Sequence, residues 1–216
     1  MATAMIPSGF TQSLTDELLG GALIEPKTGQ WVRYDVIDAK SNEHLLVRQA
    51  IVEKERVKRK QGWWLEIDIR SGDGSYSVVK MLLTGPASNS RNVVKIFRKQ
   101  GIHPPEELPV ESIEPDEKTD SGKSKRKSLG LETLLLSDNT AIRAEHWRIM
   151  RGEKELHLWS SNSVRPSGIV RLETADGVMM LRDFGVGGEL GKSVLDHTQT
   201  SKNEEDGQPE PQEDSK

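Results

Sequence analysis

The sequence contains no cysteine, and only 34% of its 216 residues are apolar, against 30% charged. The missing thiols exclude disulfides, thiolate zinc sites and cysteine nucleophiles. No apolar run approaches the roughly 18 residues of a membrane-spanning helix, so we expect no transmembrane segment. The low apolar content also predicts that part of the chain does not pack into a core.

Charge is unevenly distributed along the chain. Residues 193–216 contain seven acidic residues and two lysines, so without them the net charge moves from -4 to about +1. A nearly neutral remainder lacks the basic field typical of nucleic-acid-binding proteins, and we expect no nucleic-acid partner. Residues 1–10 lack the basic and apolar stretches of a signal peptide. The location therefore stays open: periplasm or cell envelope if a signal peptide is missing from this chain, otherwise cytoplasm.

The chain divides into three parts by composition. Residues 1–28 form a leader in which Ser13 and Asp16 resemble a helix-capping box, so we expect a short helix there. Residues 29–185 form one β domain, interrupted at about 103–129 by a charged, proline-rich linker that includes the basic run at 123–127. Residues 186–216 form a disordered acidic tail.

Alternation of apolar and polar residues begins at Trp31 and predicts β-strands. In the clearest strand, 63–70, Trp63 and Leu65 lie on one face while Glu66 and Asp68 lie on the other, which we expect to face solvent. Because roughly eight to ten such strands are too many for a flat exposed sheet, the sheet should curl. The predicted fold is mainly β: a curved antiparallel sheet or half-barrel with one or two short covering helices.

Two hairpins have a predictable register. A tight turn at 152–153 places Trp147 opposite Leu158, and an Asp-Gly turn at 176–177 places Leu172 opposite Leu181. Residues 93–100 are ambiguous. Their apolar residues have helical spacing before a glycine at 101, which favours a helix, but the same residues fit a strand.

The sequence contains none of the motifs of a phosphate-binding loop, a nucleophile elbow or a zinc protease. We therefore expect no catalytic residues, no cofactor and no enzyme activity. The hairpin register does place His146 and His157 on one face with Glu155, a set that a zinc or iron ion accepts. The alternative is an ordinary polar face of a hairpin.

Several short motifs carry a family resemblance. They are Gly29-Gln30-Trp31-Val32-Arg33-Tyr34, Gly62-Trp63-Trp64-Leu65-Glu66, Leu158-Trp159-Ser160-Ser161, Val164-Arg165-Pro166-Ser167-Gly168-Ile169-Val170-Arg171 and Asp183-Phe184-Gly185. Over about residues 29–185 the chain resembles uncharacterised bacterial envelope proteins that are similar to the LolA/LolB lipoprotein-carrier type. The resemblance implies a half-barrel covered by helices and a non-enzymatic role.

These observations lead to one main functional hypothesis and two alternatives. The main one is a carrier-like protein that holds an apolar or lipid-like ligand on the concave face, lined by Trp63, Leu65, Ile67, Val79, Met81 and Trp147. Large aromatic side chains on one face equally suit a packed core. The first alternative is a scaffold that engages a protein partner through its charged linker and tail. The second is a metal-dependent enzyme using His146 and His157.

Overall fold

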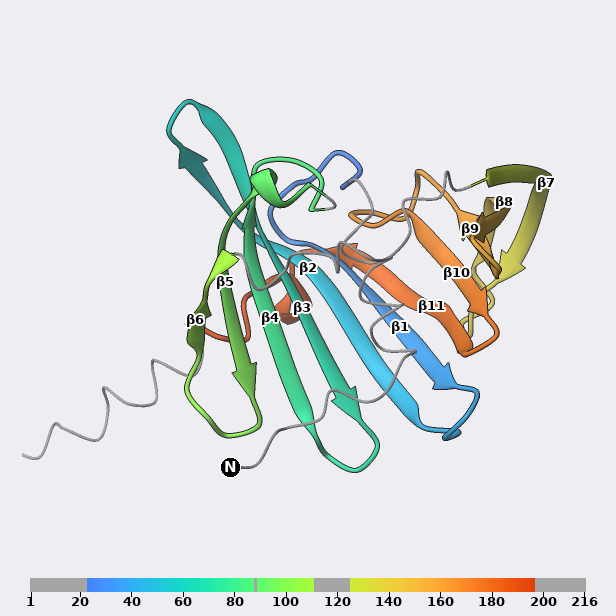
Figure 1. Cartoon of the computed structure of the whole chain (residues 1–216), viewed down its shortest axis with the longest axis horizontal. Helices are drawn as coiled ribbons and strands as arrows, with labels where there is room; N and C mark the ends of the chain where they lie inside the picture. The colour runs from blue at the N-terminus through green and yellow to red at the C-terminus, as the bar shows by residue number, and fades with distance from the viewer. Residues whose placement is uncertain (1–22, 88, 111–124, 197–216) are drawn as a thin grey trace, which may run out of the picture.

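The computed structural model describes residues 23–87, 89–110 and 125–196. They form one antiparallel sheet of eleven strands in the order β6-β5-β4-β3-β2-β1-β11-β10-β9-β8-β7 (Figure 1). The strands are β1 (Gln30–Asp38), β2 (His44–Val57), β3 (Lys60–Ser71), β4 (Tyr76–Leu83), β5 (Val93–Gln100), β6 (Glu106–Leu108), β7 (Lys125–Leu135), β8 (Ala141–Arg151), β9 (Lys154–Ser160), β10 (Ile169–Thr174) and β11 (Gly177–Val186).

The predicted fold class is confirmed: the protein is mainly β, with a curved sheet that does not close on itself. In Figure 1 the β7–β9 end turns away from the plane of β2–β5. The helices of the described residues are two short 3-10 turns, η1 (Ser90–Asn92) and η3 (Glu189–Gly191). The helix predicted for the leader lies outside the described residues. None of the described helices is long and apolar enough to cross a membrane.

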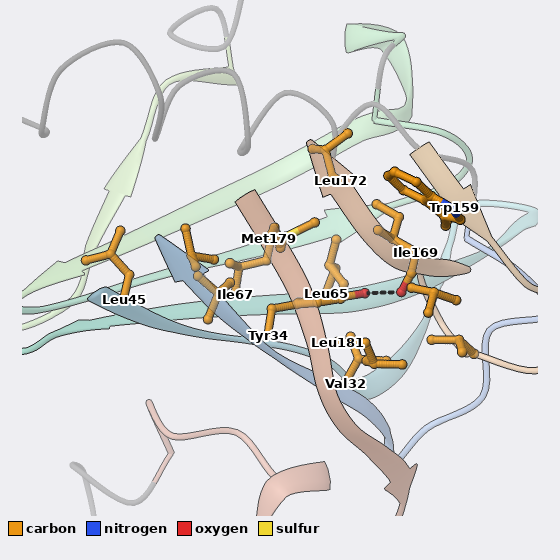
Figure 2. Packing of buried hydrophobic residues seen from close by; sticks show 14 of the residues in the cluster. Val32, Tyr34, Leu45, Leu65, Ile67, Trp159, Ile169, Leu172, Met179 and Leu181 are labelled. Carbon is orange, nitrogen blue, oxygen red and sulfur yellow. Dashed lines mark hydrogen bonds between the residues drawn. The ribbon is translucent and has the colours of Figure 1, made fainter. Parts of the chain in front are cut away.

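One face of the sheet, here called the inner face, carries the core. Alternate residues of β1 such as Val32 and Tyr34 lie on it, and Tyr34 pairs with Leu181 of β11 and with Val47 of β2. Figure 2 shows Val32, Tyr34 and Leu181 packed with other buried side chains from β3, β9 and β10. The Tyr34 hydroxyl is buried among them and donates to the Ile169 carbonyl at 3.2 Å. Burial raises the pKa of Tyr34 because the phenolate would lose its solvation.

The first predicted hairpin is confirmed, and the second has a different register. Trp147 lies opposite Leu158, as expected. In the β10–β11 hairpin, however, Leu172 lies opposite Met179 rather than Leu181, because Gly177 pairs with Thr174 instead of lying in the turn. A shift by two residues keeps each side chain on its original face, so the apolar pattern does not distinguish the two registers.

Residues 93–100 form strand β5, so the helix favoured by their spacing is wrong. The register shifts between Leu82 and Leu83, so that Val93 pairs with Leu83 while Ile96 pairs with Met81. The extra residue of this bulge allows two residues three positions apart to reach the same core. In the sequence, that spacing is the same as the spacing of a helix.

The folded part is larger than its predicted boundaries. Within the expected linker, β6 pairs with β5, and β7 begins at Lys125 and pairs with β8. Within the expected tail, residues up to 196 are described, and Leu195 is buried. The remaining linker residues 111–124 and tail residues 197–216 lie outside the described part.

Candidate functional site

The structure places the predicted ligand-binding residues of β3 and β4 side by side on the inner face. The register pairs Trp63 with Leu83, Leu65 with Met81 and Ile67 with Val79. Leu65, Ile67 and Met81 are buried members of the core, whereas Trp63 and Val79 are half-buried and pack against it. The predicted set therefore consists of a buried floor and a half-buried rim.

Trp147 lies on the same face of the sheet but six strands away from Trp63 in the strand order. Its partner Leu158 pairs in turn with Leu172, which pairs with Met179 of β11, so the inner face is continuous from β8 to β11. Trp147 is half-buried and packs against the same core. It belongs to the rim together with Trp63 and Val79.

The opposite face of the sheet, here called the outer face, holds a buried charged cluster. Arg48, Glu66 and Asp68 have exposed fractions of 3%, 0% and 2%. The expectation that Glu66 and Asp68 face solvent is therefore wrong. The Arg48 guanidinium donates to both carboxylates, and Arg70 approaches Asp68 at 3.5 Å. Buried charges require such paired hydrogen bonds, because an unpaired one costs several kcal/mol.

The C-terminal segment 189–196 covers this cluster. Arg48 Nη1 donates to the carbonyl oxygens of Leu190 (2.7 Å) and Lys192 (3.1 Å). Glu66 accepts from the Ser193 hydroxyl (2.6 Å) and from the Val194 N–H (2.9 Å). Two features of the sequence point to a covered second face: the strand around Arg48 has apolar residues on both faces, and the adjacent Trp63 and Trp64 point to opposite faces.

A serine next to a lysine raises the question of a nucleophile. Lys80 Nζ donates to Ser193 Oγ at 3.2 Å and to Asp196 at 3.3 Å, and it lies over the Trp64 ring. A nucleophilic serine gives its proton to a base and faces a substrate. Here the Ser193 hydroxyl donates its proton to Glu66, and both residues are buried where the segment covers the sheet. The arrangement suits a structural tie.

A small polar recess lies beside this cluster, between the sheet and the C-terminal segment. Its volume is about 210 Å³, and its lining residues are Arg33, Leu46, Arg48, Asp68, Arg70, Glu189, Leu190 and Val194. The Arg33 guanidinium is paired with Asp183, and Arg70 also lies over the Tyr76 ring. The charges around the recess are therefore directed at one another.

The two histidines do meet, in a hydrogen-bonded chain. His146 Nε2 lies 2.8 Å from His157 Nδ1. Glu132 contacts His146 Nδ1 at 2.7 Å and accepts from the Trp159 indole at 2.8 Å, while Glu155 contacts His157 Nε2 at 3.0 Å. The pKa of Glu132 is lowered, chiefly by the hydrogen bond from Trp159 and next by the one with His146, because both stabilise the carboxylate. The expectation that His146, His157 and Glu155 share one face is confirmed.

The contacts of the two imidazoles account for all of their nitrogens. Glu132 and His157 contact the two nitrogens of His146, and His146 and Glu155 contact the two nitrogens of His157. All four ring nitrogens thus have protein partners, and among the described residues no group of three or more His, Asp or Glu side chains is arranged so that it could hold a metal ion. A metal-dependent role of His146 and His157 stays an alternative hypothesis, which elemental analysis of purified protein checks.

Comparison with known proteins adds a likeness in fold. No protein-family model matches the chain, and no curated protein matches its sequence. The chain is similar in fold to two bacterial structures. One is a candidate exported protein with a YmcC-like fold from Bacteroides fragilis, with 9% identity, a TM-score of 0.41, and coverage of 76% of this chain and 99% of that one. The other is a candidate lipoprotein from Parabacteroides distasonis, with 10% identity, a TM-score of 0.37 and the same coverage.

Proposed function

We propose that the protein is a non-enzymatic binding protein that holds an apolar, lipid-like ligand against the inner face of its curved sheet. The observation that carries the proposal is the continuous apolar face of a sheet that does not close. Its rim residues Trp63, Val79 and Trp147 remain half-buried, so a ligand would contact them first. The resemblance of the sequence motifs to LolA/LolB-type carriers points to the same role.

The buried residues of the floor determine how a ligand can reach the inner face. Leu65, Ile67 and Met81 already pack against one another, so a ligand lies over them or displaces the groups that cover them. Either way the binding free energy comes mainly from apolar surface removed from water. A large apolar side chain contributes about 1.5–3 kcal/mol when fully buried.

Titration of the native protein with a fluorescent fatty-acid analogue tests the proposal. We expect saturable, stoichiometric binding. Trp63→Ala should weaken it about ten- to hundredfold, since each 1.4 kcal/mol is a factor of ten. Trp31→Ala is the matched control: Trp31 is also half-buried, but it lies on the outer face, where its indole donates to the Gly187 carbonyl. Absence of saturable binding by the native protein, with a normal melting curve, would refute the proposal.

A further inference from the structure

One edge of the sheet is long and open. β7 is the last strand in the sheet order, and β8 is its only partner strand among the described residues. It has 11 residues, whereas β6 at the other edge has 3. Along its free edge, an edge strand has backbone N–H and C=O groups that no neighbouring strand pairs. A long exposed edge of this kind is a template for pairing with another strand.

The same strand exposes a concentration of apolar side chains. Leu129, Leu131 and Leu135 are 44%, 59% and 63% exposed, and they are three of the six large hydrophobic residues found exposed in the described part of the chain. Isolated exposed leucines are ordinary on protein surfaces. Three on one edge strand indicate a surface that is covered by a partner.

The two halves of β7 differ in their suitability for pairing. The first half begins with the basic run 125–127 and has a bulge between Ser128 and Gly130, where Gly130 has φ +110°. Charge and bulges are devices that discourage edge pairing. The second half is regular from Leu131 to Leu135, and its one charged residue, Glu132, is already bonded to His146 and Trp159. The regular half is therefore the pairing segment.

We propose that this segment pairs antiparallel with the same segment of a second copy of the chain, about a two-fold axis at Thr133. When Thr133 pairs antiparallel with Thr133 of the second copy, Leu131 of each copy lies opposite Leu135 of the other. Because Leu131, Thr133 and Leu135 share one face of the strand, both leucine pairs are buried together. A threonine pair at the axis is favourable in cross-strand positions.

Charge complementarity supports a second copy as the occupant. In this antiparallel arrangement the basic run 125–127 of one copy lies at the end of the paired segments where β7 of the other copy passes into the turn 136–140, which contains Asp138. The basic run that discourages other strands is therefore directed toward the end of the partner that carries an aspartate. The competing arrangement, β7 of one copy on β6 of the next, would form open filaments. β6 offers only 3 residues for it, two of them acidic.

Sedimentation of the full chain over a micromolar concentration series tests the dimer. We expect a species of twice the 24.1 kDa chain mass. The double variant Leu131→Glu, Leu135→Glu places like charges opposite each other and should give the single-chain mass. The control Ile102→Glu, Val186→Glu, at exposed apolar residues elsewhere, should remain dimeric. Circular dichroism verifies that each variant is folded.

A charge-swapped variant tests the register itself. Leu131→Glu with Leu135→Lys places opposite charges across both pairs and should restore the dimer. A native chain that sediments as a single chain at every concentration would overturn the proposal, and so would a Glu/Glu variant that stays dimeric or a Glu/Lys variant that stays monomeric. These outcomes are distinguishable from failure of the ligand proposal, because the residue that tests ligand binding, Trp63, lies on β3, away from the β7 edge in the strand order.

Discussion

Arg48 connects three parts of the chain that are distant in sequence. Its side chain comes from β2, its carboxylate partners Glu66 and Asp68 come from β3, and its carbonyl partners come from the C-terminal segment 189–196. With all of these groups buried, the guanidinium neutralises charge that water cannot reach. Its removal takes the paired cation from buried Glu66 and leaves Asp68 with Arg70 at 3.5 Å. A buried charge that has lost its partner is more costly than the loss of the pair itself.

Arg48→Ala should therefore lower the free energy of unfolding by about 3–5 kcal/mol at neutral pH. Urea denaturation measures the change. Arg182→Ala is the matched control, since Arg182 also pairs with an aspartate, Asp35, but both side chains are about half exposed, at 48% and 53%. Such a surface pair contributes about 0.2–1 kcal/mol. Equal effects of the two variants would mean that the Arg48 cluster is not desolvated.

At the scale of elements, the C-terminal segment 189–196 acts as a cover for the outer face. A chain that ends after residue 196 keeps the hydrogen bonds of this segment to Arg48 and Glu66, so its unfolding free energy should stay close to that of the full chain. A chain that ends after residue 188 loses the carbonyl partners of Arg48 and the donors to Glu66. Hydrogen bonds to charged groups contribute about 1.5–3 kcal/mol each, so we expect a loss of several kcal/mol.

Urea denaturation of the two truncated chains checks this expectation, and equal stabilities would contradict it. The boundary also matters for the scaffold hypothesis. A deletion that starts at residue 193 removes the buried Ser193 and Leu195, so it would disturb the fold along with the tail. Deletion of residues 197–216 in a pull-down removes only the acidic tail and separates the two effects.

The alternation of apolar and polar residues predicts some features of the strands and not others. Alternation encodes which face a side chain takes, and it correctly placed Leu65, Trp147 and His157. It does not encode whether another segment covers the polar face of a strand, so alternation alone predicts an exposed Glu66, whereas Glu66 is buried. It also does not encode bulges or shifts by two residues, which is why β5 had the spacing of a helix and Leu172 had a different partner. The hairpin register predicts that His146 and His157 share one face. It does not predict Glu132 beside them, because Glu132 comes from β7, whose first residues lie in the expected linker.

At the scale of the whole molecule, the strand order joins two halves of the chain through their ends. Strands β1–β6 come from the N-terminal half and β7–β11 from the C-terminal half, and in the sheet they meet only where β1 pairs with β11. That ladder runs from Gln30 opposite Val186 to Asp38 opposite Gly177. Arg33 and Asp183 also pair across it, 150 residues apart in sequence. Each half alone would expose one open strand edge and the core side chains that pack across the β1–β11 ladder.

Two fragments, residues 1–117 and 118–216, should therefore fail to fold separately and should form one complex when refolded together. The physical reason is that the β1–β11 ladder satisfies two otherwise open strand edges and buries Val36 and Met179 against each other. Val36→Asp in the first fragment should abolish association, because it places a charge in this buried ladder. Ile37→Asp should not, because Ile37 is the exposed neighbour on the same strand. Co-purification on a tag of one fragment, with circular dichroism of each, gives the answer. If each fragment had a native β spectrum alone and the two did not associate, the sheet would consist of two independent units rather than one.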